Sequence, residues 1–125
     1  MLQSYKYAKL QIQNYLKSDK ISVKEAKLLF KIRTNMLEVR MNYKGNYLKN
    51  KEDQGSTAPS EFELLQCPLC NKHLDNEENI FKCEELKNDS EADFNNLFSK
   101  DMNKISKALK QFYKLWKIRK SKLAN

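Results

Sequence analysis

Glycine and proline are scarce in this chain, with 2 residues of each among 125. Folds built from many strands need many turns, and turns draw heavily on these two residue types. Their scarcity, together with a hydrophobic content of 40%, favours helices over a many-stranded sheet. We predict a mainly α protein of about three amphipathic helices that form one compact domain.

Other absences restrict the class of protein. No run of about 18 apolar residues exists, so no membrane span is expected, and the first residues lack the apolar core of a secretion signal. The chain holds 1 histidine, and it has neither a glycine-rich phosphate loop nor a Gly-x-Ser-x-Gly turn. We therefore expect no enzymatic activity and no small-molecule substrate.

The charged residues are unevenly distributed. Residues 1–51 carry 12 basic and 3 acidic side chains, residues 52–99 carry 3 basic and 12 acidic ones, and residues 100–125 carry 9 basic and 1 acidic. Two cationic segments thus flank an acidic middle, while the whole chain has a formal net charge of +8. This pattern indicates either pairing within the chain or a polyanionic partner such as nucleic acid.

All 3 cysteines lie close together in the acidic middle. Cys67 and Cys70 sit on one tight turn with two residues between them, and Cys83 follows after twelve more. Thiolates at this spacing can hold a tetrahedral Zn²⁺ ion, and an odd number of cysteines fits a reducing compartment better than a disulfide framework. We predict a small zinc-knuckle β-hairpin before the last helix, in an intracellular protein, nuclear or cytoplasmic.

A closed structural zinc site needs a fourth ligand. His73, the only histidine, is the fourth ligand that we predict, although the chain must fold back sharply for it to reach the metal. Asn79 is the other candidate by position, but an amide oxygen is a poor partner for a site made soft by sulfur. Glu78 or a water molecule could also take this place, and a metal-free cluster of buried thiols is the alternative.

The cysteine segment resembles a known family. An Arg-Thr-Asn-Met run at 33–36 on an expected helix, followed by the Cys-Pro-Leu-Cys turn and then Cys83, is similar to the cysteine-histidine zinc segment downstream of reverse transcriptase in retrotransposon-type open reading frames. The similarity covers roughly residues 22–86. It implies zinc ligation by Cys67, Cys70 and Cys83, with Asn79 where the family has histidine. It also implies a fragment or domesticated remnant, because the chain has no room for a polymerase domain.

The helices are predicted from apolar periodicity. Residues 2–18 and 100–120 repeat apolar side chains at three- and four-residue steps. Ser22 and Glu25 form a capping-box pattern that predicts the start of a helix. This helix is expected to reach about residue 43, and Gly45, just beyond it, can end it. Residues 64–66 are predicted to form a short strand, and residues 94–98 a short helix. The core is expected to contain Ala26, Leu29, Phe30, Ile32, Met36, Leu37, Val39, Met102, Ile105, Ala108, Leu109, Phe112, Leu115 and Trp116.

Four segments follow one another along the chain. We expect residues 1–48 to form a basic helical segment. Residues 49–60 are predicted to form a flexible loop, because their small, polar and charged side chains cannot bury enough surface to offset the entropy of ordering. Residues 61–86 form the zinc-knuckle-like segment, and residues 87–125 combine an acidic connector with a basic amphipathic helix.

Basic side chains on two helices could contact phosphates in a sequence-independent, salt-sensitive way. Lysines that merely cover the solvent face of amphipathic helices are the simpler explanation. A third interpretation is a helical protein–protein interaction module, in which the apolar helix faces pair with a partner chain or a second copy. A metal-free, decayed mobile-element fragment is a further alternative. The candidate nucleic-acid-binding residues are Lys24, Lys27, Lys31, Arg33, Arg40, Lys110, Lys114, Lys117, Arg119 and Lys120.

Overall fold

A computed structural model describes residues 20–49 and 59–124. Its elements are, in chain order, α2 (Val23–Arg33), the 3-10 helix η1 (Arg40–Tyr43), α3 (Lys44–Leu48), α4 (Glu61–Leu65), α5 (Asn79–Lys82), the 3-10 helices η3 (Glu84–Leu86) and η4 (Phe94–Phe98), and α6 (Met102–Ala124). These residues contain helices and no β-strand, so the mainly α prediction is confirmed. The predicted helix over residues 2–18 and most of the predicted loop over residues 49–60 lie outside the described residues.

α2 begins where the sequence predicts but ends well before residue 43. Ser22 Oγ accepts a hydrogen bond from Glu25 N–H (3.2 Å), and the Glu25 carboxylate accepts one from Ser22 N–H (3.0 Å), which is the predicted capping box. At the other end, Asn35 takes a left-handed conformation with φ 56°, and Met36 N–H bonds to Lys31 O at 2.8 Å. These are the features of a Schellman C-cap, so the prediction of one long helix was wrong.

The chain beyond Asn35 buries its apolar residues without a helix. Leu37 and Val39 are 0% and 1% exposed, as predicted for the core, but they reach it from a bent, non-helical segment before η1. Met36 was also predicted for the core, but it is 45% exposed, so this prediction was wrong. Gly45 lies inside α3 instead of ending a helix. The left-handed residue that ends a helix is usually glycine and sometimes asparagine, and here Asn35 ends the helix.

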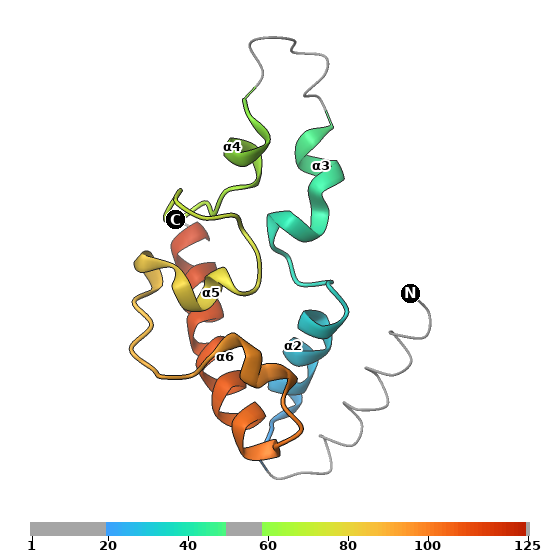
Figure 1. The fold of residues 1–125 in the computed structure, drawn as a ribbon, viewed down its shortest axis with the longest axis vertical. Coiled ribbons are helices and arrows are strands. Elements are labelled where there is room, and N and C mark those ends of the chain that lie inside the picture. Colours follow the sequence, from blue (N-terminus) through green and yellow to red (C-terminus); the bar gives the residue numbers. More distant parts are fainter. Residues whose placement is uncertain (1–19, 50–58, 125) are drawn as a thin grey trace.

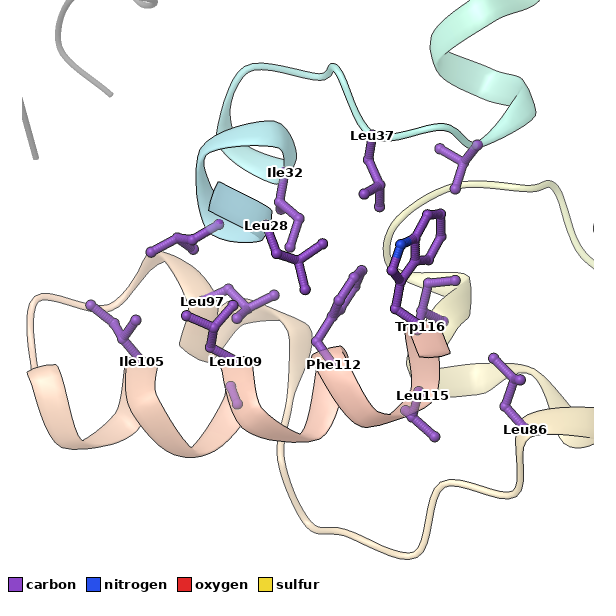
Figure 2. Packing of buried hydrophobic residues seen from close by; sticks show 14 of the residues in the cluster. Leu28, Ile32, Leu37, Leu86, Leu97, Ile105, Leu109, Phe112, Leu115 and Trp116 are labelled. Atoms are coloured by element: carbon purple, nitrogen blue, oxygen red, sulfur yellow. The ribbon is translucent and has the colours of Figure 1, made fainter. Parts of the chain in front are cut away.

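α6 supplies one side of the core along most of its length. Figure 2 shows Leu109 and Phe112 of α6 pointing toward α2, with Leu97 of η4 packed nearby. The predicted α6 positions Ile105, Ala108, Leu109, Phe112, Leu115 and Trp116 are all buried, while Met102 is half-buried. The apolar faces that could have paired with a partner chain therefore pack against each other within this chain.

The predicted β-hairpin does not form among the described residues. Residues up to Leu65 belong to α4, which Ser60 caps by accepting a hydrogen bond from Glu63 N–H at 3.2 Å. Two acidic residues in the first turn also suit a helix N-terminus. Only Gln66 is extended, and it pairs with Leu74 in an isolated antiparallel bridge. Residues 67–73, which include Cys67 and Cys70, therefore form a loop closed by this bridge.

The last helix and the cluster before it largely match the predictions. Residues 94–98 form η4, and α6 begins at Met102, two residues after the predicted start. The later start is explained by Asp101, whose carboxylate accepts a hydrogen bond from Asn103 N–H at 2.9 Å. Ser99, which directly precedes the predicted helix, accepts a hydrogen bond from Asp101 N–H at 3.0 Å.

Figure 1 shows α2 beside the first half of α6 at one end of the molecule, and α3 with α4 at the other. α5 lies against α6, where the rings of Phe81 and Phe112 meet edge to face with centroids 5.7 Å apart. The cysteine segment is thus placed between the long helix and the α3–α4 end. Within the described ranges, the search for a helix long and apolar enough to cross a bilayer finds none.

Candidate metal centre

A tight turn after α4 presents Cys67 and Cys70. Cys67 O accepts a hydrogen bond from Asn71 N–H (3.0 Å), and Cys67 N–H donates one to His73 O (2.7 Å). Asn71 takes a left-handed conformation with φ 57°, which asparagine tolerates better than most residues. Backbone bonds within seven residues therefore shape this turn, without the strands of a hairpin.

Cys83 completes a cluster of three sulfurs. It follows α5 directly, and its N–H bonds to Asn79 O at 2.7 Å. The three Sγ atoms lie within 4.8 Å of one another, and those of Cys67 and Cys83 are 3.9 Å apart. In a tetrahedral site with Zn–S bonds of about 2.3 Å, the sulfurs are about 3.8 Å apart. The cysteines that the sequence singles out thus lie together and could hold a metal ion.

The surroundings of the sulfurs also suit a cation. Burial raises the pKa of the Cys83 thiol to about 12, and the neighbouring Cys67 and Cys70 sulfurs add to this effect. At Cys70 burial opposes ionisation as well, but hydrogen bonds from the backbone N–H groups of Lys72 and His73 outweigh it and lower the pKa. Such bonds orient thiolates in metal sites, and a bound cation supplies the positive charge that clustered thiolates need.

The candidates for a fourth ligand lie in different surroundings. His73 is exposed, and it is not among the ligand atoms that lie within 4.8 Å of one another. Glu78 is exposed and pairs with Lys82 at 2.9 Å. Asn79 is 2% exposed, and both polar atoms of its amide are buried with no hydrogen-bond partner in the described structure. Of these three residues, only Asn79 is buried, and its amide oxygen, the atom that could bind a metal, makes no hydrogen bond in the described structure.

The basic residues of the first half have mixed surroundings. Lys24 and Lys27 are exposed on α2. The other three candidates are engaged within the chain: Lys31 pairs with Glu38 at 2.7 Å, Arg33 donates to Leu97 O at 2.7 Å, and Arg40 donates to Leu64 O at 3.3 Å.

On α6 the candidate residues also divide. Lys114, Lys117 and Lys120 are exposed, and the exposed Lys110 pairs with Glu25 at 3.3 Å. Arg119 is only 4% exposed, because its guanidinium is bound to Asp75 in the interior. Its charge is therefore neutralised inside the molecule and not presented to solvent.

Asp75 was not predicted as a site residue, yet it is 0% exposed and holds Arg119. It belongs to an acidic stretch whose members look alike in sequence, and no local pattern distinguishes it from its solvated neighbours. Its role is revealed only by its partner Arg119, which lies 44 positions further along the chain.

Comparison with protein-family models, curated proteins and solved structures gives no match. Three soft sulfur donors favour Zn²⁺ over the hard cations Mg²⁺ and Ca²⁺, which prefer oxygen ligands.

Proposed function

We propose that this chain is a non-enzymatic, zinc-finger-like protein of retrotransposon origin, in which one Zn²⁺ ion on Cys67, Cys70 and Cys83 has a structural role. The approach of the three sulfurs to within 4.8 Å of one another carries the proposal. The origin is supported by the resemblance of the Cys-Pro-Leu-Cys turn and its flanking residues to the retrotransposon zinc segment.

The ion would join two parts of the chain that follow short helices. Cys67 and Cys70 belong to the turn after α4, whereas Cys83 follows α5. These helices have 5 and 4 residues, and helices this short are unstable on their own. A metal that binds only the folded arrangement adds its binding free energy to folding, which is useful to a domain with a small core.

Zinc stoichiometry tests this proposal. The protein is purified without added metal and its zinc is counted by elemental analysis, beside a Cys70→Ser variant. Cys70 is chosen because it is half-buried, whereas Cys67 and Cys83 are 0% and 2% exposed, so its replacement disturbs the core least. We expect one zinc per chain, lost in the variant together with thermal stability. A folded wild-type protein that takes up no zinc, even when Zn²⁺ is supplied, overturns the proposal.

A row of lysines favours nucleic-acid binding as a second function. Lys107, Lys114 and Lys117 are exposed and share the side of α6 opposite its buried face. No acidic residue occurs between Met102 and Ala124. Because no acidic side chain on this helix neutralises the row, it presents positive charge to phosphates.

A salt titration with matched variants tests this second function. Binding of a fluorescent single-stranded oligonucleotide is followed by anisotropy for the wild type, Lys114→Ala/Lys117→Ala, and Lys44→Ala/Lys49→Ala. Both variants lose two exposed lysines, but only the first pair lies on α6. We expect the α6 variant alone to reduce the slope of log affinity against log salt, by about 2. An equal reduction of the salt slope in the two variants, or no oligonucleotide binding by the wild type, would contradict a site on α6.

A further inference from the structure

The amide of Asn79 is buried without a partner. The residue is 2% exposed, and neither its Oδ1 nor its Nδ2 atom has a hydrogen-bond partner among the described residues. Most buried side-chain polar atoms in proteins are hydrogen-bonded, because an unpaired one loses its contacts with water and gains nothing in return. The Asn79 amide therefore needs a partner that the described chain does not supply.

Asn79 and Cys83 are one helical turn apart. Cys83 N–H bonds to Asn79 O at 2.7 Å, which is the backbone contact of an α-helix. Residues four apart lie on the same face of a helix, and their side chains are neighbours. Since the Sγ atom of Cys83 is 3.9 Å from that of Cys67, the face of α5 that carries Asn79 is the face that meets the sulfur cluster.

We propose that Asn79 Oδ1 is the fourth zinc ligand, which gives a site of three sulfurs and one amide oxygen. This inference rests on the proposed function, because it requires that Cys67, Cys70 and Cys83 bind Zn²⁺. The oxygen of an amide has lone pairs available for a metal and loses no proton on binding. It is a weaker donor than imidazole to an ion that already has three sulfur ligands, so Asn79→His is expected to strengthen the site.

An Asn79→Leu variant separates ligation from an ordinary structural role. The leucine side chain has the same branched arrangement of heavy atoms as that of asparagine and has no polar atoms. In metal-free protein the change removes two buried, unpaired polar atoms, so the melting temperature should hold or rise. In zinc-bound protein it removes a ligand, so zinc affinity should fall at least about tenfold and the melting temperature should fall with it. A side chain that only packs would move both melting temperatures in the same direction.

The experiment compares wild type, Asn79→Leu, Asn79→His and the matched control His73→Ala, which changes the exposed histidine of the same segment. Zinc affinity is measured by competition with a chromogenic chelator, and melting temperatures are measured with zinc and with EDTA. The visible spectrum of the Co²⁺-loaded protein reports the donor set directly. We expect the spectrum to change with both substitutions of Asn79 and to stay unchanged with His73→Ala.

The outcomes distinguish the two claims. If Asn79→Leu binds zinc as tightly as wild type while His73→Ala loses it, His73 is the ligand; the Asn79 assignment is then overturned and the proposed function stands. If wild type binds no zinc, the proposed function itself fails. Should Asn79→Leu not fold, Asn79→His decides, because tighter zinc binding and a changed Co²⁺ spectrum are expected only where residue 79 faces the metal. An unchanged spectrum and affinity in Asn79→His overturn the assignment.

Discussion

Arg119 and Asp75 form a buried ion pair with two hydrogen bonds. The Nη1–Oδ1 and Nη2–Oδ2 distances are 2.6 Å and 2.8 Å, and the side chains are 4% and 0% exposed. The Asp75 carboxylate also accepts a hydrogen bond from Arg40 N–H at 2.8 Å, and its backbone oxygen accepts one from Met41 N–H at 3.0 Å. One aspartate thus connects the cysteine segment both to the chain before α3 and to α6.

Removal of either partner should be strongly destabilising, because it leaves the other charge buried without compensation. We expect Asp75→Ala and Arg119→Ala each to lower the free energy of unfolding by about 3–5 kcal/mol. The double variant should cost less than the sum of the two, since the residues share one interaction. Urea unfolding of the three variants measures these differences.

Lys31→Ala is the control for this prediction. Lys31 and Glu38 also form an ion pair, at 2.7 Å, but their side chains are 45% and 54% exposed. An exposed pair of this kind contributes less than about 1 kcal/mol. A loss in Arg119→Ala no greater than that in Lys31→Ala would show that the buried pair does not stabilise the fold.

The start of α2 and the α6 core stripe could be predicted because they depend on neighbouring residues. The capping box joins Ser22 to Glu25, three positions further on, and the buried positions of α6 repeat with the helical period. The spacing of the cysteines is equally local, and it correctly indicates that the three sulfurs meet.

The features that escaped prediction depend on distant contacts. Asn35 and Gly45 can both adopt a left-handed conformation, and the choice between them is set by where Leu37 and Val39 find the core. Arg119 looks like any other basic residue of an amphipathic helix until Asp75, 44 positions away, is placed beside it. The surroundings of Asn79 likewise follow from the packing of α5 and not from its sequence neighbours.

The left-handed conformation of Asn35 gives a sharp test of the end of α2. A β-branched residue is strained there, so Asn35→Val should lower the free energy of unfolding by about 1–2 kcal/mol. Asn35→Gly should leave stability unchanged or raise it, because glycine is the usual residue at this position of a C-cap. Thermal unfolding distinguishes the two variants. If valine is tolerated as well as glycine, the helix does not end at this residue.

Gly45 provides the opposite case. It lies in α3, and a Cβ atom added there would meet nothing within 4 Å. Gly45→Ala should therefore stabilise the protein by about 0.5–1 kcal/mol, since alanine loses less backbone entropy in a helix. Chemical denaturation measures the gain. A loss of stability would instead support the sequence-based prediction that Gly45 ends a helix.

Glu25 of α2 pairs with Lys110 of α6, and its ionisation should make the free energy of unfolding depend on pH in the acidic range. Burial opposes its ionisation, but hydrogen bonds from Ser22 and from Lys110 Nζ, 3.3 Å away, outweigh burial and lower the pKa below its ordinary value of 4.5. Because the pKa is lower in the folded state, the ionised carboxylate stabilises the fold above the unfolded-state pKa. This contribution is lost as the pH falls through the folded-state pKa.

Glu25→Gln isolates this contribution. Above about pH 5 the wild type should be the more stable protein, and the difference should shrink as the pH approaches about 3, since glutamine does not titrate. The measurement is the free energy of unfolding across this range, with Lys110→Ala as the companion variant. Loss of the Lys110 ammonium removes one cause of the lowered pKa, so the acid-induced fall in stability should become shallower. A wild type and a Glu25→Gln variant that differ by the same amount at every pH would mean that Glu25 has equal pKa values in the folded and unfolded chains.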